Sequence, residues 1–418
     1  MAREVLCPDG MRPRTHRDGG LRSRLRSRCA GSRMGGATPG PSAPVEAPPP
    51  PLRIALVIER SEAGAGGAEN VAWQVGAGLA RAGDDVSVVC RSGAPPPGTR
   101  LVRVRSPGGW KPLRVLAFSR AAADATRTGF DVVQSFSRTR HQDVFRAGGG
   151  SHADYLERLH GRAGARLRAL SPRHAVQLRI ERAVFTDARQ LVLCNSTLVR
   201  DQIAARYRVP ACRLAVIRNG VDLARFHPDR RTREGVALRA ELGAGSRTVW
   251  LFAGSSFPRK GLDVALRALA ASADTDSVLW VAGRDDPARW LAGAARLGLA
   301  DRVRFLGPRG DLEALFAAAD GLLLPTRYDA FANVCLEAAA AGLPSVTSGA
   351  NGAAEIAREA GIVVDDPEDV AGFARALDRL ADPVARVALG KAARARAEQH
   401  GWDDHVRALR ALYARVLP

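Results

Sequence analysis

Two carboxylates and a polar helix start lie close together in YDAFANVCLEAAAAGLP (328–344). Asp329 follows a short apolar run, and Glu337 lies four residues after Asn333, so Asn333 and Glu337 share one face of a helix. A carboxylate on an Ala- and Leu-rich helix is unfavourable to bury without a partner. We therefore expect Asp329 to reach sugar hydroxyls and Glu337 to bind a ribose, with open N–H groups near Ala332 receiving phosphate oxygens. The alternative is a helix-start carboxylate and a solvated Glu337.

Two adjacent cations form a second candidate site in SSFPRKGLD (255–263). Arg259 and Lys260 lie in a strand-to-helix loop, where the N-terminus of the next helix also attracts anions. Arg can hold phosphate oxygens in a bidentate manner, and Lys acts as a point charge. The pair therefore suits a diphosphate whose charge grows as a bond to it breaks. Two solvated surface cations are the alternative.

A glycine-rich turn, GAGGAEN (64–70), follows the first apolar strand. Glycine permits positive φ and close approach of a ligand to the backbone, so Gly66 and Gly67 are candidate binding residues. The turn lacks the spacing and the acidic residue of a dinucleotide fingerprint, and a plain tight turn is the alternative. The six cysteines show no metal-ligand spacing, so we expect no metal and no cofactor.

A further polar pair, His141 and Asp143, follows the strand DVVQSFS (131–137). Because ligands of open α/β sheets bind near the ends of strands, we expect this pair to enter a cleft and to orient a substrate. A loop ion pair between Asp143 and a neighbouring arginine is the alternative, with three candidates: Arg138, Arg140 and Arg146.

These motifs are carried by alternating strands and helices. Continuous apolar runs typical of buried parallel strands include RIALVI, DVSVVCR and QLVLCNS in a first series, and RTVWLFAGS, SVLWVAG, RVRFLG, GLLLPT and LPSVTS in a second. Helices are expected at 68–81, 262–271, 311–319 and 333–341. Such alternation indicates right-handed parallel α/β units. The sequence therefore predicts two Rossmann-like, doubly wound domains that face a cleft.

Composition shifts set the expected domain boundaries. Residues 1–51 are predicted to be a disordered basic and Pro-rich tail, for which a start at Met34 is an alternative interpretation. Residues 52–222 are expected to form an acceptor-binding domain, and residues 223–401 a nucleotide-sugar-binding domain. Residues 402–418 are expected to form a helix that crosses back to the first domain.

The net charge of +19 indicates an anionic partner. The basic, leucine-containing segment 156–185 suits an anionic membrane surface, although a solvated arginine-rich face is the alternative. No apolar run approaches the ~20 residues of a membrane span, so we expect a cytoplasmic protein that is peripheral on the inner membrane face. Aromatic residues make up only 5% and do not alternate with basic ones, which argues against nucleic-acid binding.

Taken together, the motifs resemble the large nucleotide-sugar-dependent family of retaining GT-B glycosyltransferases, glycosyl transferases group 1. The resemblance covers about residues 52–417 and includes VIRNGVDLARFHP (216–228), FLGPRGD (305–311) and the three motifs above. DVFRAGGGSHADYL and SSFPRKGLDVAL are similar to lipopolysaccharide core glucosyltransferases. One departure is Asp329, where the family usually has Glu, which changes the reach toward the donor sugar.

The resemblance implies transfer of a hexose, with UDP-glucose as the first choice of donor, to a cell-envelope glycan or glycolipid such as lipopolysaccharide core. The expected catalytic residues are Arg259, Lys260, Asp329, Glu337 and Asp143. The expected substrate-binding residues are Gly66, Gly67, His141, Gly254, Gly307, Arg309, Phe331, Ala332 and Asn333. The alternatives are an inverting transferase or sugar-nucleotide epimerase of the same fold, and a non-enzymatic basic protein that binds nucleic acid or membrane.

Overall fold

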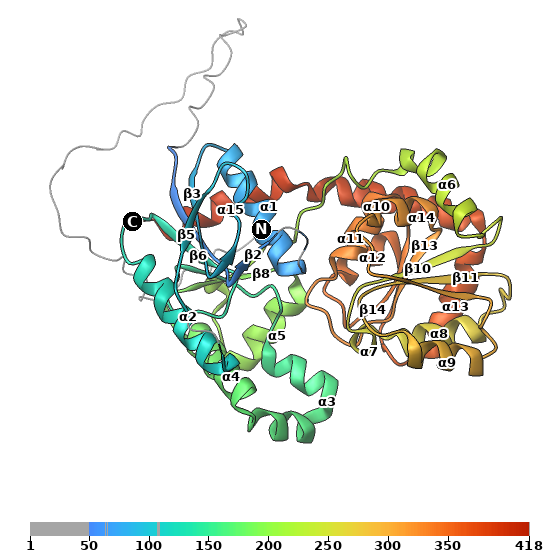
Figure 1. Cartoon of the computed structure of the whole chain (residues 1–418), viewed down its shortest axis with the longest axis horizontal. Helices are drawn as coiled ribbons and strands as arrows, with labels where there is room; N and C mark the ends of the chain where they lie inside the picture. Colours follow the sequence, from blue (N-terminus) through green and yellow to red (C-terminus); the bar gives the residue numbers. More distant parts are fainter. Residues whose placement is uncertain (1–49, 63, 65, 107–108, 418) are drawn as a thin grey trace, which may run out of the picture.

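The chain folds around two separate parallel β-sheets, each covered by helices (Figure 1). The computed structural model describes residues 50–62, 64, 66–106 and 109–417. Most of the predicted tail, residues 1–49, lies outside this part. The two sheets and their helices form the two α/β domains that the alternation of strands and helices predicts.

The first sheet has the strand order β5-β3-β1-β6-β7-β8-β9, with all neighbours parallel. Its strands are β1 (Arg53–Val57), β3 (Asp85–Cys90), β5 (Arg100–Arg103), β6 (Val132–Ser135), β7 (Val144–Arg146), β8 (Leu191–Cys194) and β9 (Leu214–Val216). A short parallel pair, β2 (Arg60–Ser61) and β4 (Ser92–Gly93), lies beside it. β1, β6 and β8 are almost wholly buried, as expected for strands that helices cover on both faces.

The helices of the first domain connect these strands. They are α1 (Gly67–Arg81), α2 (Lys111–Ala125), α3 (His152–Ala169), α4 (Pro172–Thr186) and α5 (Thr197–Tyr207). α3 bends at Gly161, whose φ of +66° is a left-handed conformation that glycine adopts readily. α3 and α4 pack together and extend below the rest of the molecule in Figure 1.

The second sheet is also fully parallel, in the order β12-β11-β10-β13-β14-β15. Its strands are β10 (Val249–Ala253), β11 (Val278–Ala282), β12 (Val303–Gly307), β13 (Gly321–Leu324), β14 (Ser345–Ser348) and β15 (Gly361–Val364). The helices of this half are α6 (Glu234–Glu241), α7 (Phe257–Lys260), α8 (Leu262–Ala271), α9 (Ala288–Arg296), α10 (Leu312–Ala318), α11 (Asn333–Ala340), α12 (Ala354–Ala360), α13 (Val370–Ala381) and α14 (Pro383–Ala397). The two parallel sheets with their helices thus have the architecture expected of the GT-B fold.

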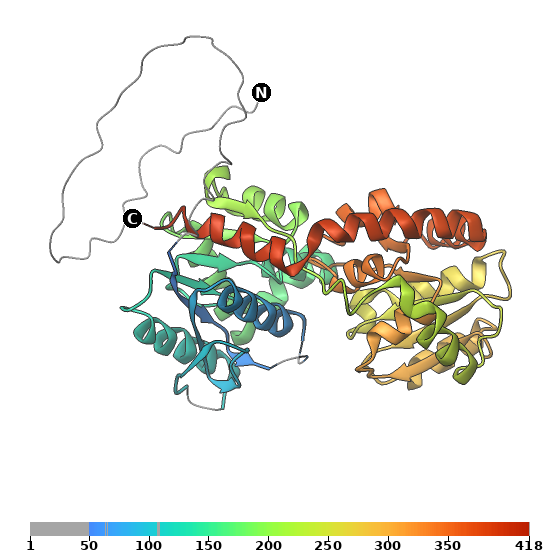
Figure 2. The same cartoon turned by 90° about the horizontal axis from the view of Figure 1, so that it is seen from above.

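The C-terminal helix returns to the first domain. Figure 2 shows α14 on the second domain followed by α15 (Trp402–Tyr413) on the first. α15 packs against α1, and Leu409 and Tyr413 are completely buried in the first core. The Tyr413 hydroxyl donates a hydrogen bond of 2.6 Å to Gln134 Oε1 in β6. The final helix therefore braces the first domain. Among the helices that the structure describes, none has the length and hydropathy of a membrane span.

Candidate active site

Three charged side chains form an ion-paired cluster after the second-domain strands β10 and β13. Lys260 Nζ lies 2.6 Å from Asp329 Oδ2, and Arg259 Nη1 lies 2.8 Å from the same oxygen. Arg259 also donates to the backbone carbonyl of Tyr328 at 2.8 Å. The structure thus brings together the two cations of one predicted motif and the first carboxylate of another.

The surroundings of Asp329 keep its carboxylate ionised. Burial by itself would raise the pKa of Asp329, but the charges and hydrogen bonds of Lys260 and Arg259 outweigh burial and lower this pKa to about 2. Gly254, at the end of β10, has a φ of +137°, and a Cβ there would lie 3.4 Å from Lys260 Cε. The predicted binding residue Gly254 therefore leaves space for the lysine side chain.

An additional short helix, α7, precedes the predicted helix α8 and contains the two cations, and its N-terminus is not an open anion site. The first turn is the four-residue α7, and Asp285 accepts hydrogen bonds from the N–H groups of Ser256 (2.7 Å) and Phe257 (2.8 Å). Because an internal carboxylate already binds these donors, a phosphate at this position would interact with Arg259 and Lys260 rather than with the helix end.

The start of α11 is a helix end that remains open in part. The N–H of Ala332 donates to Asn351 Oδ1 at 3.1 Å, and the N–H of Phe331 donates to Asp329 Oδ1 at 3.2 Å. Of the open N–H groups predicted around Ala332–Asn333, the one at Ala332 is therefore corrected, and the N–H of Phe331 is engaged as well. Within the described part of the chain, the N–H groups of Asn333 and Val334 have no protein acceptor, and α11 has no side-chain cap. These two donors are suited to a ligand oxygen.

Glu337 lies one turn into α11 and carries an unsatisfied oxygen. Its Oε2 atom is buried and has no hydrogen-bond partner among the described residues. Burial raises the pKa of Glu337 to about 7, although the nearby charges of Arg225 and Lys260 act in the opposite direction. A buried acceptor without a donor is suited to accept a hydrogen bond from a ligand hydroxyl.

The loop that follows β12 closes another side of this crevice. Gly307 has a φ of +66°, and its carbonyl accepts from Gly283 N at 2.9 Å. Arg309 is paired with Asp311 through Nε at 2.8 Å, so its guanidinium is directed within its own loop. Arg225, from the segment between the domains, donates to the Gly310 carbonyl at 3.2 Å. The carbonyls of Gly307 and Gly310 are therefore both engaged within the protein, and the backbone contacts to a nucleobase that the resemblance implies stay a prediction.

The first domain meets the start of α11 from the opposite side. A Cβ on Gly67 would lie 3.9 Å from Asn333 Nδ2, so the glycine-rich turn faces the second-domain motif. Gly66 precedes α1 as its N-cap in an extended conformation. The Asn333 Oδ1 atom accepts a hydrogen bond of 2.6 Å from Asn219 in the inter-domain segment. The glycine turn, the inter-domain segment and α11 thus converge.

His141 and Asp143 do not reach this crevice, which corrects a prediction. Asp143 immediately precedes β7, and its Oδ2 atom accepts from Val133 N, near the start of β6, at 2.9 Å. Only eight residues separate the end of β6 from the start of β7, and within them the chain returns to the amino ends of these parallel strands. Both side chains therefore lie at that edge of the sheet. They line a surface hollow of about 1180 Å³ beside α2. A role of His141 or Asp143 in the cleft is therefore not supported by the geometry.

Sequence reasoning missed several polar residues that shape the site. Asn351 (1% exposed) fixes the start of α11 through the N–H of Ala332, and Asn219 (3% exposed) and Arg146 (5% exposed) lie on the first-domain side. All three follow or end strands at the carboxyl edge of a sheet. Because ligands of open α/β sheets bind at this edge, polar residues at strand ends could have been recognised as candidates. Among the described residues, no group of three or more His, Cys, Asp or Glu side chains is placed to hold a metal ion.

Comparisons with known families cover both domains. Residues 65–225 match the family described as Glycosyltransferase Family 4, and residues 247–382 match Glycosyl transferases group 1. A D-inositol 3-phosphate glycosyltransferase from Salinispora arenicola is 36% identical over 257 residues, which cover 57% of each chain. The chain thus spans a little over half the length of the curated relatives it matches.

Solved structures agree on the fold. WaaG, a glycosyltransferase involved in lipopolysaccharide biosynthesis, has a TM-score of 0.75 and 23% identity, covering 86% of this chain and 99% of WaaG. HepE from Anabaena, in complex with UDP and glucose, has a TM-score of 0.67 and 18% identity, covering 87% of this chain and 99% of HepE. Both domains thus match glycosyltransferase family models, the second as a glycosyl transferases group 1 domain, and the solved structures show that the fold is GT-B.

Proposed function

We propose that this chain is a metal-independent, retaining hexosyltransferase that uses a nucleotide-diphosphate sugar. The observation that carries the proposal is the crevice of the second domain. It combines two cations, Arg259 and Lys260, with the open start of α11 and the unsatisfied carboxylate of Glu337. The cations and the helix start suit the diphosphate of such a donor, and Glu337 suits its ribose.

UDP-glucose is the first choice of donor. The fold neighbour HepE has been solved with UDP and glucose, which supports testing UDP-sugars first. UDP-galactose, GDP-mannose and ADP-heptose remain to be compared in the same assay.

The proposed mechanism works through orientation and electrostatics. In the free protein the Asp329 carboxylate neutralises Arg259 and Lys260, and an incoming diphosphate would compete for the same two cations. Once the phosphates hold the cations, Asp329 is released toward the sugar hydroxyls. As the glycosidic bond breaks, the cations stabilise the growing charge on the leaving diphosphate. The acceptor oxygen bonds to the anomeric carbon on the face from which the diphosphate departs, and the leaving phosphate takes the proton of that acceptor hydroxyl.

The decisive experiment follows product stereochemistry. Wild-type protein is incubated with UDP-glucose and acceptor, and the anomeric configuration of the product is read by NMR. An α-linked product from the α-linked donor supports retention, whereas a β-linked product identifies the inverting alternative. Conversion of the nucleotide sugar without an acceptor would identify the epimerase alternative, and absence of both reactions with every donor would refute the enzyme assignment.

The proposed acceptor is a cell-envelope glycan or glycolipid such as lipopolysaccharide core. The name of the Salinispora relative sets a second acceptor to test, D-inositol 3-phosphate. Both acceptors are anionic, which agrees with the net charge of +19. Parallel assays with truncated lipopolysaccharide core and with inositol phosphate distinguish them, because only one should give a saturable product.

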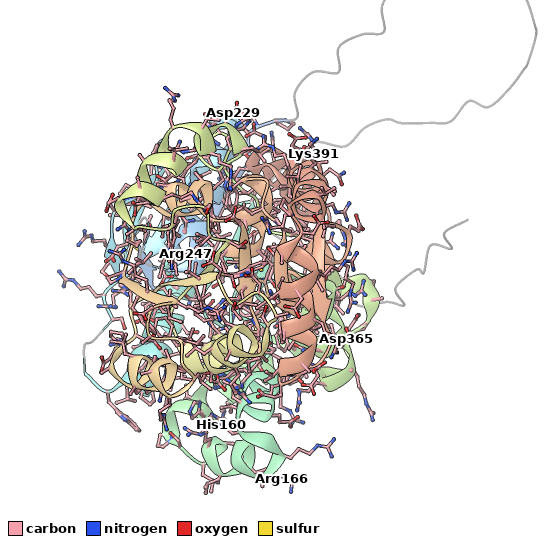
Figure 3. The ribbon with its side chains drawn as sticks, turned by 90° about the vertical axis from the view of Figure 1, so that its right-hand side faces the viewer. His160, Arg166, Asp229, Arg247, Asp365 and Lys391 are labelled. Carbon is pink, nitrogen blue, oxygen red and sulfur yellow. The ribbon has the colours of Figure 1, made fainter. Side chains whose placement is uncertain are left out.

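The proposed partner of the α3–α4 projection is an anionic membrane surface. Leu167 and Leu170 are 71% and 78% exposed at the turn between the helices. None of the exposed arginines of this projection pairs with an acidic side chain in the described part of the chain; they are Arg158, Arg162, Arg166, Arg168, Arg173, Arg179 and Arg182. Figure 3 shows His160 and Arg166 at the outer end of α3, away from the main body.

Vesicle binding tests this partner. The double variant Leu167→Glu/Leu170→Glu should lose most of its sedimentation with vesicles containing phosphatidylglycerol, because both apolar contacts become repulsive. Val384 and Val387 on α14 are also exposed, so Val384→Glu/Val387→Glu is the matched control and should bind as the wild type does. Equal binding of both double variants would contradict the proposed surface.

A further inference from the structure

Arg146 is a buried cation at the carboxyl end of β7, in the middle of the first sheet. It is 5% exposed, and no acidic side chain within the described residues forms an ion pair with it. Its guanidinium lies 5.5 Å from the centre of the Phe136 ring, and Nη2 donates a hydrogen bond of 2.5 Å to Asn219 Oδ1. Burying an unpaired charge is unfavourable, so a function that requires it is expected.

The contacts of Arg146 continue across the two domains. Asn219 Nδ2 donates to Asn333 Oδ1 at 2.6 Å, which makes a continuous chain from β7 to the first residue of α11. The direction of this chain is fixed, because a guanidinium has donors and no acceptor. Asn219 must turn its oxygen to Arg146 and therefore its amide nitrogen to Asn333. Asn333 must then turn its oxygen to Asn219.

This direction leaves the Asn333 amide nitrogen as the terminal donor. No acceptor for Asn333 Nδ2 exists among the residues that the structure describes, and the glycine turn lies beside it, with a Cβ on Gly67 at 3.9 Å. The N–H groups of Asn333 and Val334 are unpaired at the same helix end. Three donors thus point to one region, in which an anionic oxygen would be bound.

We propose that Arg146 acts as a positioning residue which, through Asn219, orients the Asn333 amide so that its N–H₂ group binds a phosphate oxygen of the donor nucleotide. This inference rests on the proposed donor site. Charge assistance from Arg146 strengthens each following hydrogen bond, since polarised chains are cooperative. The orientation of the Asn333 amide at the proposed phosphate site therefore depends on Arg146 in the first domain.

The surrounding backbone holds the chain of contacts in place. A Cβ on Gly148 would lie 1.9 Å from Arg146 Nη1, and a Cβ on Gly220 would lie 2.6 Å from the Trp402 ring. Both glycines therefore permit close packing around the guanidinium and the asparagine. His405 Nδ1 lies 2.6 Å from the Arg218 carbonyl, which anchors the segment that carries Asn219 to α15.

Isothermal titration of purified full-length protein with UDP, GDP and ADP tests the inference, using the nucleotide that binds the wild type most tightly. Arg146→Met should weaken binding by roughly 10-fold, the effect of losing one charge-assisted hydrogen bond. Arg146→Lys keeps a donor-only cation and should restore binding to within about 3-fold. The Michaelis constant for the donor should rise in Arg146→Met with a smaller change in kcat.

Arg213 supplies the matched control. It is also 5% exposed in the first domain and donates to the backbone carbonyls of Gln190 and Phe185, away from the cleft. Arg213→Met should lower the melting temperature without changing nucleotide affinity. If Arg146→Met weakens binding no more than Arg213→Met does, the inference is overturned and the proposed function stands. If the wild type binds none of the three nucleotides, the proposed function fails with it.

Asn219→Asp tests the direction of the chain without removing Arg146. The new carboxylate pairs with Arg146 but has no donor for Asn333, whose N–H₂ group should then turn toward Asp and leave its oxygen facing the phosphate site. Melting temperature should be retained, while nucleotide affinity should fall by roughly 10-fold or more. Unchanged affinity in folded Asn219→Asp would overturn the inference.

Discussion

Replacing Glu337 by Gln is expected to stabilise the free protein while weakening nucleotide binding. Burial of Glu337, with Oε2 left without a hydrogen-bond partner, raises its pKa from 4.5 to about 7. Between these two pH values the folded protein holds a proton that the unfolded chain has released. The free energy of unfolding therefore falls as pH rises through this window, and the penalty is complete above pH 7.

The size of this free-energy penalty follows from the shift in the pKa of Glu337. Each tenfold change in proton affinity corresponds to ~1.4 kcal/mol, so ionised Glu337 destabilises the fold by about 3 kcal/mol at pH 8. Glu337→Gln carries no charge at any pH and should recover most of this free energy at pH 8, but none at pH 4. In the complex, ribose hydroxyls would donate to the ionised carboxylate, so the same substitution should lower nucleotide affinity.

Urea unfolding at pH 4 and pH 8 measures both effects, and the completely buried Trp250 and Trp280 supply fluorescence from the second domain. Glu355→Gln is the contrasting variant. Glu355 accepts hydrogen bonds from Thr197 and from Arg218 Nε at 2.8 Å, so its loss should destabilise the protein by roughly 1–3 kcal/mol. The reasoning is refuted if Glu337→Gln is no more stable than the wild type at pH 8, or if its effect is the same at both pH values.

Three further outcomes are expected. Asp329→Asn should bind UDP roughly 10-fold more tightly in calorimetric titration, because Arg259 and Lys260 lose their internal counter-ion. Its turnover should fall. Weaker UDP binding would contradict the proposed competition between Asp329 and the diphosphate. Arg259→Met should lower kcat by ~10²–10³ in a coupled UDP-release assay, since a fixed donor to the leaving group is lost. Transfer should persist after dialysis against EDTA, and loss of transfer restored by Mg²⁺ or Mn²⁺ would disprove metal independence.

The sequence by itself determined the architecture and which candidate site residues share a helix. Alternating buried strands and helices are a local property of hydrophobic periodicity, so both parallel sheets follow from it, and the expected helix 262–271 coincides with α8. The spacing of Asn333 and Glu337 places them on one helix face for the same reason. The very short strands β7 and β9 carry too few residues for a periodic signal, and they were not predicted.

Only the tertiary structure decided which sheet edge and which partner each polar side chain has. Asp143 was placed at the wrong edge because the unpredicted β7 begins directly after it, which turns the chain back toward the amino ends. The N–H of Ala332 is bound by Asn351, and the amide of Asn333 by Asn219, which is 114 residues away in sequence. Hydrophobic periodicity indicates which side of a helix or strand is buried. The pairings of polar side chains arise only when separate elements pack against one another. That packing leaves the N–H groups of Asn333 and Val334 as the open donors.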